Sequence, residues 1–217
     1  MEVIGFALRI AILAIVFSAA SHAEDAAAPS KQDVEGKAQY CKDCHGASGE
    51  GFRGYYPIPR LAGQTTEYFE NQLRAFAEHR RENDISIVMS RVHGLADASP
   101  AMRTALATYF SGLNPEPVEG GPENLVAMGR KIFFEGVPET NIPACAACHG
   151  PEAKGHEIIP RLAGQLYPYV TKELAEWSTA RGQDPAVKDT SRIMAPIAHS
   201  LTQPQISAVA AYISNLK

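Results

Sequence analysis

Cys41-Lys42-Asp43-Cys44-His45 and Cys145-Ala146-Ala147-Cys148-His149 are the two stretches that decide the fold of this chain. Each reads Cys-x-x-Cys-His, and together they use all four cysteines of a 217-residue sequence. This spacing is typical of covalent haem attachment, in which two thiols bond to one edge of a porphyrin and the adjacent histidine ligates the iron. The sequence therefore predicts two covalently bound haem c groups, attached at Cys41, Cys44, Cys145 and Cys148, with iron ligated by His45 and His149.

Other chemistries of paired cysteines fit the sequence less well. A structural zinc site uses four ligands, whereas each cluster offers two thiols and one histidine with no second pair close by. A thioredoxin-like redox pair needs alternating strands and helices around it, and the flanking sequence shows no such alternation. A structural disulfide within each cluster is the remaining alternative.

The segment downstream of each cluster is repeated. Pro-Arg-Leu-Ala-Gly-Gln occurs at residues 59–64 and again at residues 160–165. Later matches keep nearly the same offset, such as Tyr68 with Tyr169 and Leu73 with Leu174. The chain is therefore predicted to be two copies of one domain. A stretch rich in proline and glycine, residues 114–122, is the natural linker, so we place the copies at residues 24–115 and 116–217.

Each copy has helical patterning. Apolar residues recur at helical spacing over 68–76 and 169–177, and the closing segments 105–113 and 206–216 read as amphipathic helices. Upstream of each cluster, a glycine precedes an aromatic residue by four positions, as Gly36 with Tyr40 and Gly129 with Phe133. This spacing puts both on one helix face, where the glycine is expected to allow a close helix crossing.

A haem iron with both axial positions filled needs a second ligand, and each copy supplies a methionine at a matching position. Met89 lies 44 residues after His45, and Met194 lies 45 residues after His149. Thioether sulfur is a soft ligand that raises the reduction potential relative to a second imidazole. We therefore expect Met89 and Met194 to complete the two iron coordination spheres.

Neighbouring residues compete for this role. His93 follows Met89 by four residues, whereas His199 follows Met194 by five, so the two histidines do not match in position. We therefore expect them to be surface groups or neighbours of the ligands. Met102 and Met128 have no counterpart in the other copy and are expected to be packing residues.

The start of the chain indicates export. An apolar run over residues 10–20 follows Arg9 and precedes Ser21-His22-Ala23, the pattern of a signal-peptidase site. We expect residues 1–23 to be a signal peptide, with an uncleaved anchor as the alternative. Beyond them, each copy has only two more acidic than basic residues, so no strong field of one sign is present and nucleic acid is not an expected partner.

With these features the sequence resembles the cytochrome c4 family of dihaem cytochromes. The resemblance covers nearly the whole chain after residue 23 and rests on the two clusters, the hexapeptide repeat, the paired methionines and the closing helices with Tyr109 and Tyr212. It implies an all-α fold of two tandem class I cytochrome c domains, each a small helical fold around its haem. It also implies that Pro59 and Pro160 offer their carbonyls to the axial imidazoles.

By the same resemblance, Arg60 and Arg161 would lie near haem propionates. A solvated surface charge is the alternative for these two arginines. Extra residues at 137–143, and about four before Met194, break the repeat and are expected to make the two haem environments unequal.

The resemblance implies an electron carrier of the periplasm, soluble or peripherally associated with a membrane, with no substrate chemistry of its own. Its partners would be redox proteins, with a quinol-oxidising complex or a dehydrogenase as donor and a terminal oxidase as acceptor. Two alternatives stay open. One is a haem enzyme or gas sensor with an open axial position, and the other is the electron-accepting subunit of a dehydrogenase complex.

Overall fold

The computed structural model describes residues 28–54, 56–81, 86–92, 94–95, 97–118, 120–177 and 191–217. The predicted signal peptide, residues 1–23, and His93 lie outside these residues. Within the described part of the chain, no helix combines the length and the apolar character that crossing a bilayer requires.

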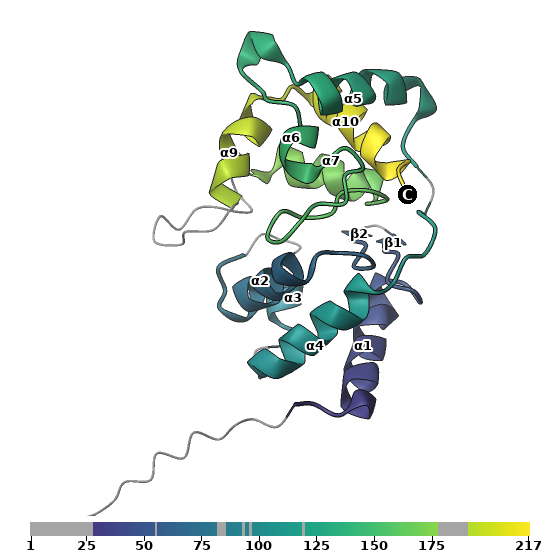
Figure 1. Cartoon of the computed structure of the whole chain (residues 1–217), viewed down its shortest axis with the longest axis vertical. Helices are drawn as coiled ribbons and strands as arrows, with labels where there is room; N and C mark the ends of the chain where they lie inside the picture. Colours follow the sequence, from purple (N-terminus) through teal and green to yellow (C-terminus); the bar gives the residue numbers. More distant parts are fainter. Residues whose placement is uncertain are drawn as a thin grey trace, which may run out of the picture.

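Two helical bodies lie one above the other along the long axis of the molecule, joined by an extended segment (Figure 1). The helices of the first body are α1 (Lys31–His45), α2 (Thr66–Ala77), α3 (Ser86–Ser90) and α4 (Pro100–Ser111). Those of the second are α5 (Glu123–Glu135), α6 (Ala146–His149), α7 (Tyr167–Ala175), α9 (Ser191–Ser200) and α10 (Gln203–Ser214), with a short 3₁₀ turn η1 at Pro138–Thr140. The predicted all-α class is confirmed.

One small hairpin departs from the all-helical prediction. Strands β1 (Phe52–Arg53) and β2 (Pro57–Ile58) pair antiparallel, and a single bridge between His156 and Ile159 occupies the corresponding place in the second copy. The hairpin accommodates three additional residues, because 14 positions separate His45 from Pro59 in the first copy and 11 separate the corresponding pair in the second. Strands of two residues are too short to leave an alternating pattern in the sequence.

Side-chain caps fix where the long helices begin. Ser30 Oγ accepts the backbone N–H of Asp33 at 3.2 Å, and the Asp33 carboxylate accepts the N–H of Ser30, which forms a reciprocal capping box at the start of α1. Ser99 accepts the N–H of Met102 at 3.1 Å, and Pro100 occupies the first turn of α4. These caps satisfy backbone donors that have no partner inside the helix.

The core of the first copy lies where α4 packs against α2 on one side and α1 on the other. The rings of Phe69 and Phe110 stack with centroids 5.4 Å apart, and Ala38 of α1 is fully buried beside them. The helical pattern predicted over residues 68–76 thus faces this core, and Met102 packs against its edge as expected.

The core of the second copy depends on a close crossing of α5 and α10. A methyl group on Gly129 would lie 1.9 Å from the carbonyl oxygen of Ala208, so only glycine fits at this crossing. One turn later Phe133 is fully buried against Tyr212, with ring centroids 5.3 Å apart. The predicted role of Gly129 is confirmed.

Three expectations were wrong. Gly36 has no neighbour within 4 Å and Tyr40 is exposed, because the core-facing side of α1 carries Ala38 instead. Helix α10 is not amphipathic, since it packs against both α5 and α7 and is buried from residue 208 to residue 214. Met128 is exposed on α5 and is not a packing residue.

A buried ion pair connects the two bodies. Arg81, just after α2, donates to the carboxylate of Glu173 and to the hydroxyl of Tyr169 on α7, each at 3.0 Å. The two charged side chains are only 10% and 14% exposed. The Arg81 guanidinium also donates to Gln72 at 2.7 Å and lies over the ring of Phe76, so it is held from both sides of the interface.

Candidate haem sites

The two cysteine clusters occupy different helical contexts. The first forms the last turn of α1, whereas in the second Cys145 is the residue immediately before the single turn α6. The structure has no disulfide at any of the four cysteines, and Cys44 and Cys148 are exposed. Burial raises the pKa of the Cys41 thiol, and likewise that of Cys145, to about 11. Each cluster therefore presents one open and one sheltered sulfur.

The adjacent histidines are buried and held in one tautomer. His45 Nδ1 lies 2.8 Å from the carbonyl oxygen of Pro59, and His149 Nδ1 lies 3.0 Å from that of Pro160. A carbonyl can only accept, so each Nδ1 carries the proton and each Nε2 keeps its lone pair. Burial also lowers the pKa of both imidazoles below their ordinary value, which favours the neutral form that metals bind. The contacts implied for Pro59 and Pro160 are present.

A repeated loop brings each proline carbonyl to its histidine. The chain leaves the helix at Gly46 with φ 89°, and in the second copy at Gly150 with φ 78°. The N–H groups of Leu61 and Ala62 then both donate to the carbonyl of Gly49, and Ala153 accepts the equivalent pair in the second copy. These bonds fold the chain back so that the residue after the loop, Pro59 or Pro160, faces the imidazole.

The paired methionines occupy matching places. Met89 lies on α3 and packs against the core of the first copy, whereas Met194 lies half-buried on α9. Each helix follows the one that carries the repeated tyrosine, α2 or α7. His199, one of the competing histidines, is exposed on α9, in agreement with its expected surface position.

Arg60 and Arg161 are buried at the interface between the copies, only 4% and 8% exposed. Arg60 donates through Nε to the carbonyl of Ala62 and through Nη2 to that of Pro115, each at 2.9 Å. Its Nη1 is buried and has no hydrogen-bond partner among the described residues. Burial, with the nearby charge of Arg161, lowers the pKa of Arg60 to about 10.

Both guanidinium groups are buried, and Arg60 Nη1 is a donor that an anion could satisfy. The carboxylates of haem propionates fit this requirement, and the solvated position considered for the arginines is wrong. The sheltered sulfurs and the neutral imidazoles meet the remaining needs of a covalently attached haem.

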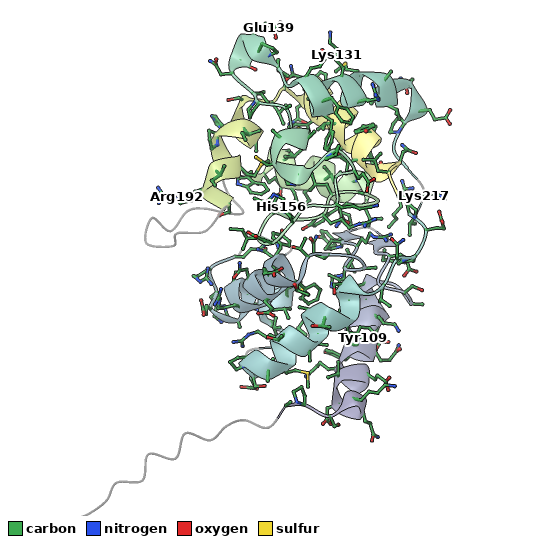
Figure 2. The ribbon with its side chains drawn as sticks, in the orientation of Figure 1. Tyr109, Lys131, Glu139, His156, Arg192 and Lys217 are labelled. Atoms are coloured by element: carbon green, nitrogen blue, oxygen red, sulfur yellow. The ribbon has the colours of Figure 1, made fainter. Side chains whose placement is uncertain are left out.

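The last residue of the repeated hexapeptide crosses the interface. Gln64 binds the backbone of Arg161 and Gln165 binds that of Arg60, each through one accepted and one donated hydrogen bond of 2.7–3.1 Å. Figure 2 shows side chains from both bodies meeting in this region, where the loop that carries His156 approaches the first copy. Sequence analysis found the repeat but missed this role. The signal was the word-for-word identity of the two hexapeptides, which extends beyond the proline and arginine.

Comparison with known proteins places the chain in a family. Residues 126–217 match the family described as Cytochrome c. The chain is 36% identical over 214 residues to cytochrome c-552 of Acidithiobacillus ferridurans, covering 97% of this chain and 87% of that protein. Cytochrome c4 of Azotobacter vinelandii is 31% identical over 84% of this chain and 87% of its own length. The chain belongs to the cytochrome c4 family.

Two further comparisons extend this result. The solved structure of Acidithiobacillus ferrooxidans cytochrome c4 superposes with a TM-score of 0.70 at 36% identity, covering 82% of this chain and 99% of that one. A thiosulfate dehydrogenase electron acceptor of Thiomonas intermedia is 36% identical over 95% of this chain and 89% of that protein. Like its family, this chain is a dihaem c-type electron carrier, with its Cys-x-x-Cys-His clusters as the attachment sites.

Proposed function

We propose that this chain relays electrons in the periplasm between two redox proteins through two six-coordinate haems, and that it catalyses no substrate reaction of its own. His45 and Met89 would hold the iron in the first copy, residues 24–115, and His149 and Met194 would hold it in the second, residues 116–217. The observation that carries this proposal is the matched pair of buried, Nδ1-protonated histidines, each bonded to a proline carbonyl one residue before a buried arginine.

The protein groups hold each site in a single state. A bound haem c supplies an iron that accepts and releases one electron. The proline carbonyl holds the proton on Nδ1 and aims Nε2 at the metal. The buried arginines supply the positive charge that propionates require, and the apolar cores keep water from the imidazole. A site whose ligands are fixed in this way reorganises little when the charge on the metal changes.

An optical spectrum tests this assignment. We expect the oxidised holoprotein to show a weak red-edge band from sulfur–iron(III) bonding, and the reduced protein to show no change when carbon monoxide is added. Rapid carbon monoxide binding by either haem would show an accessible iron and would favour the enzyme or sensor alternative.

The methionine ligands can be tested one at a time. Because the two methionines lie in separate bodies of the molecule, Met89→Ala should remove half of the red-edge band and open one iron to carbon monoxide, and Met194→Ala should do the same for the other. The double variant should lose the whole band. Loss of the entire band in either single variant would contradict two independent sites.

A periplasmic dehydrogenase is the donor that the comparisons favour, because one relative of nearly full length is named as a thiosulfate dehydrogenase electron acceptor. A terminal oxidase is the acceptor implied by the family resemblance. Mixing the oxidised protein with a thiosulfate dehydrogenase and thiosulfate tests the donor. Reduction of both haems within seconds supports it, whereas no reduction directs the search to quinol-oxidising complexes.

A further inference from the structure

We propose that Gln64 and Gln165 are positioning residues that act across the interface, each tuning the histidine–iron bond of the other copy. This inference rests on the proposed function, in which His45 and His149 are axial ligands. It assigns to the last residue of the repeated hexapeptide a role in the haem site of the copy to which it does not belong.

The link runs through a single peptide group. The carbonyl of Pro160 accepts from His149 Nδ1 at 3.0 Å. The N–H of Arg161 belongs to the same peptide group, and it donates to Oε1 of Gln64 at 2.7 Å. A proton donor on the imidazole of the second copy is therefore connected, through one amide, to a side chain of the first copy.

The same connection exists in the opposite direction. His45 Nδ1 donates to the carbonyl of Pro59 at 2.8 Å, and the N–H of Arg60 in that peptide group donates to Oε1 of Gln165, also at 2.8 Å. In the first link the two bonded residues are 97 positions apart, and in the second they are 105 positions apart. Because each link joins one copy to the other, neither copy can form it alone.

The glutamine side chains are held firmly. Each is buried, and its amide nitrogen donates to the carbonyl of the same arginine whose N–H it accepts, at 3.1 Å in both copies. Each Oε1 also accepts the N–H of the residue that follows the glutamine, Thr65 or Leu166, at 3.0 Å. With these partners the amide has one orientation, and its oxygen faces the arginine N–H.

The sign of the effect follows from polarisation. When a peptide N–H donates to an acceptor, its carbonyl oxygen becomes more negative and accepts more strongly. A stronger bond from Nδ1–H gives the imidazole more anionic character, which stabilises the oxidised iron and lowers the reduction potential. Removing a glutamine should therefore raise the potential of the haem in the opposite copy.

The test is a reciprocal pair of variants in the holoprotein, Gln64→Leu and Gln165→Leu. Redox titration is followed by the haem methyl NMR signals, which are assigned to each copy through their contacts with its side chains. We expect Gln64→Leu to raise the potential of the second haem and Gln165→Leu that of the first. A change of about two- to tenfold in the ratio of reduced to oxidised haem corresponds to at most about 60 mV. Shifts in the haem of the same copy, or equal shifts in both, would overturn the proposal.

Leucine leaves two buried N–H groups without an acceptor, so a second variant guards against misfolding. Gln64→Glu keeps an oxygen that accepts from Arg161 and Thr65 and loses only the bond that the amide nitrogen donates to the Arg161 carbonyl. Its negative charge makes the acceptor stronger, so it should lower the potential of the second haem rather than raise it. A rise in this variant would contradict the polarisation mechanism.

Thr65→Val is the matched control. It removes another hydrogen bond between the copies, from Thr65 Oγ1 to the carbonyl of Glu157 at 2.6 Å, without touching either peptide link. Both potentials should stay unchanged, and a shift like that of Gln64→Leu would point to general loosening of the interface and sink the proposal.

The wild-type protein separates this inference from the proposed function. Hyperfine-shifted ring signals from both histidines, with the red-edge band, establish the axial ligands. If these signals are missing, the ligand assignment fails. If they are present and the glutamine variants move neither potential, only the cross-copy link fails.

Discussion

At the scale of single residues, each candidate axial histidine meets two conditions at once. His45 and His149 are buried, which keeps them neutral, and each donates from Nδ1 to a proline carbonyl, which directs the lone pair of Nε2 away from the backbone. Proline suits this position because the bond uses only its carbonyl, and its missing N–H is not needed there.

The same burial makes the stability of the haem-free chain depend on pH. The pKa of each histidine lies below the ordinary value of 6.5, so the unfolded chain takes up protons that the folded chain excludes as the pH falls below about 6.5. We expect the free energy of unfolding to be level above this pH and to fall below it, by at most about 1.4 kcal/mol per pH unit for each histidine, until the folded pKa is passed.

Denaturant unfolding of the haem-free chain between about pH 5 and pH 8 measures this change, since no iron occupies Nε2 there and most carboxylates stay ionised in that range. A free energy of unfolding that rises on acidification would contradict the neutral, buried state of the imidazoles.

Residue-level chemistry was predictable from sequence wherever it was local. The cysteines and the histidine of each cluster lie within five positions, and their spacing alone indicates haem attachment. The partners of Gln64 lie 97 positions away, and no local pattern specifies how one copy faces the other. The cross-copy bonds could therefore be described only from the structure.

At the scale of helices, two glycines that look equivalent in sequence have opposite roles. Gly129 lies where α5 crosses α10, whereas Gly36 faces open space on α1. Sequence spacing placed both glycines four residues before an aromatic residue, but it could not tell which face of α1 meets α4. The two helices are not equivalent, because the cysteine cluster follows Tyr40 directly in the first copy and begins 12 positions after Phe133 in the second.

Alanine substitution should separate these roles. Gly129→Ala forces a methyl group against the Ala208 carbonyl and should destabilise the protein by about 1–3 kcal/mol. Gly36→Ala removes the backbone freedom of an exposed helical glycine and should stabilise it by about 0.5–1 kcal/mol. Thermal unfolding of the two variants beside the parent protein measures both, and shifts of the same sign would contradict the packing described for one of the helices.

At the scale of the whole molecule, the buried pair of Arg81 and Glu173 joins the copies at a point that the repeat does not share. The position in the first copy that corresponds to Glu173 is Gln72, which also contacts the Arg81 guanidinium. The interface is therefore nearly symmetric at the glutamines and asymmetric in charge at this pair.

Removing the carboxylate should weaken the association of the two bodies. Glu173→Ala leaves a buried guanidinium with less compensation for its charge and should cost about 3 kcal/mol. Calorimetry should then show two separate unfolding transitions in place of one. Glu152→Ala, which removes an exposed ion pair with Lys154, is the matched control and should leave the transition unchanged. A single, unshifted transition in the Glu173 variant would show that this pair does not couple the bodies.

The reciprocal glutamine bonds have a consequence for biosynthesis. During synthesis the first copy emerges while the second is unfinished, and the acceptor for the Arg60 N–H lies 105 positions further along the chain. Until that segment arrives, the N–H of Arg60 has only water as an acceptor. The first haem site can therefore reach its final hydrogen-bond set only after the second copy has been made and has docked.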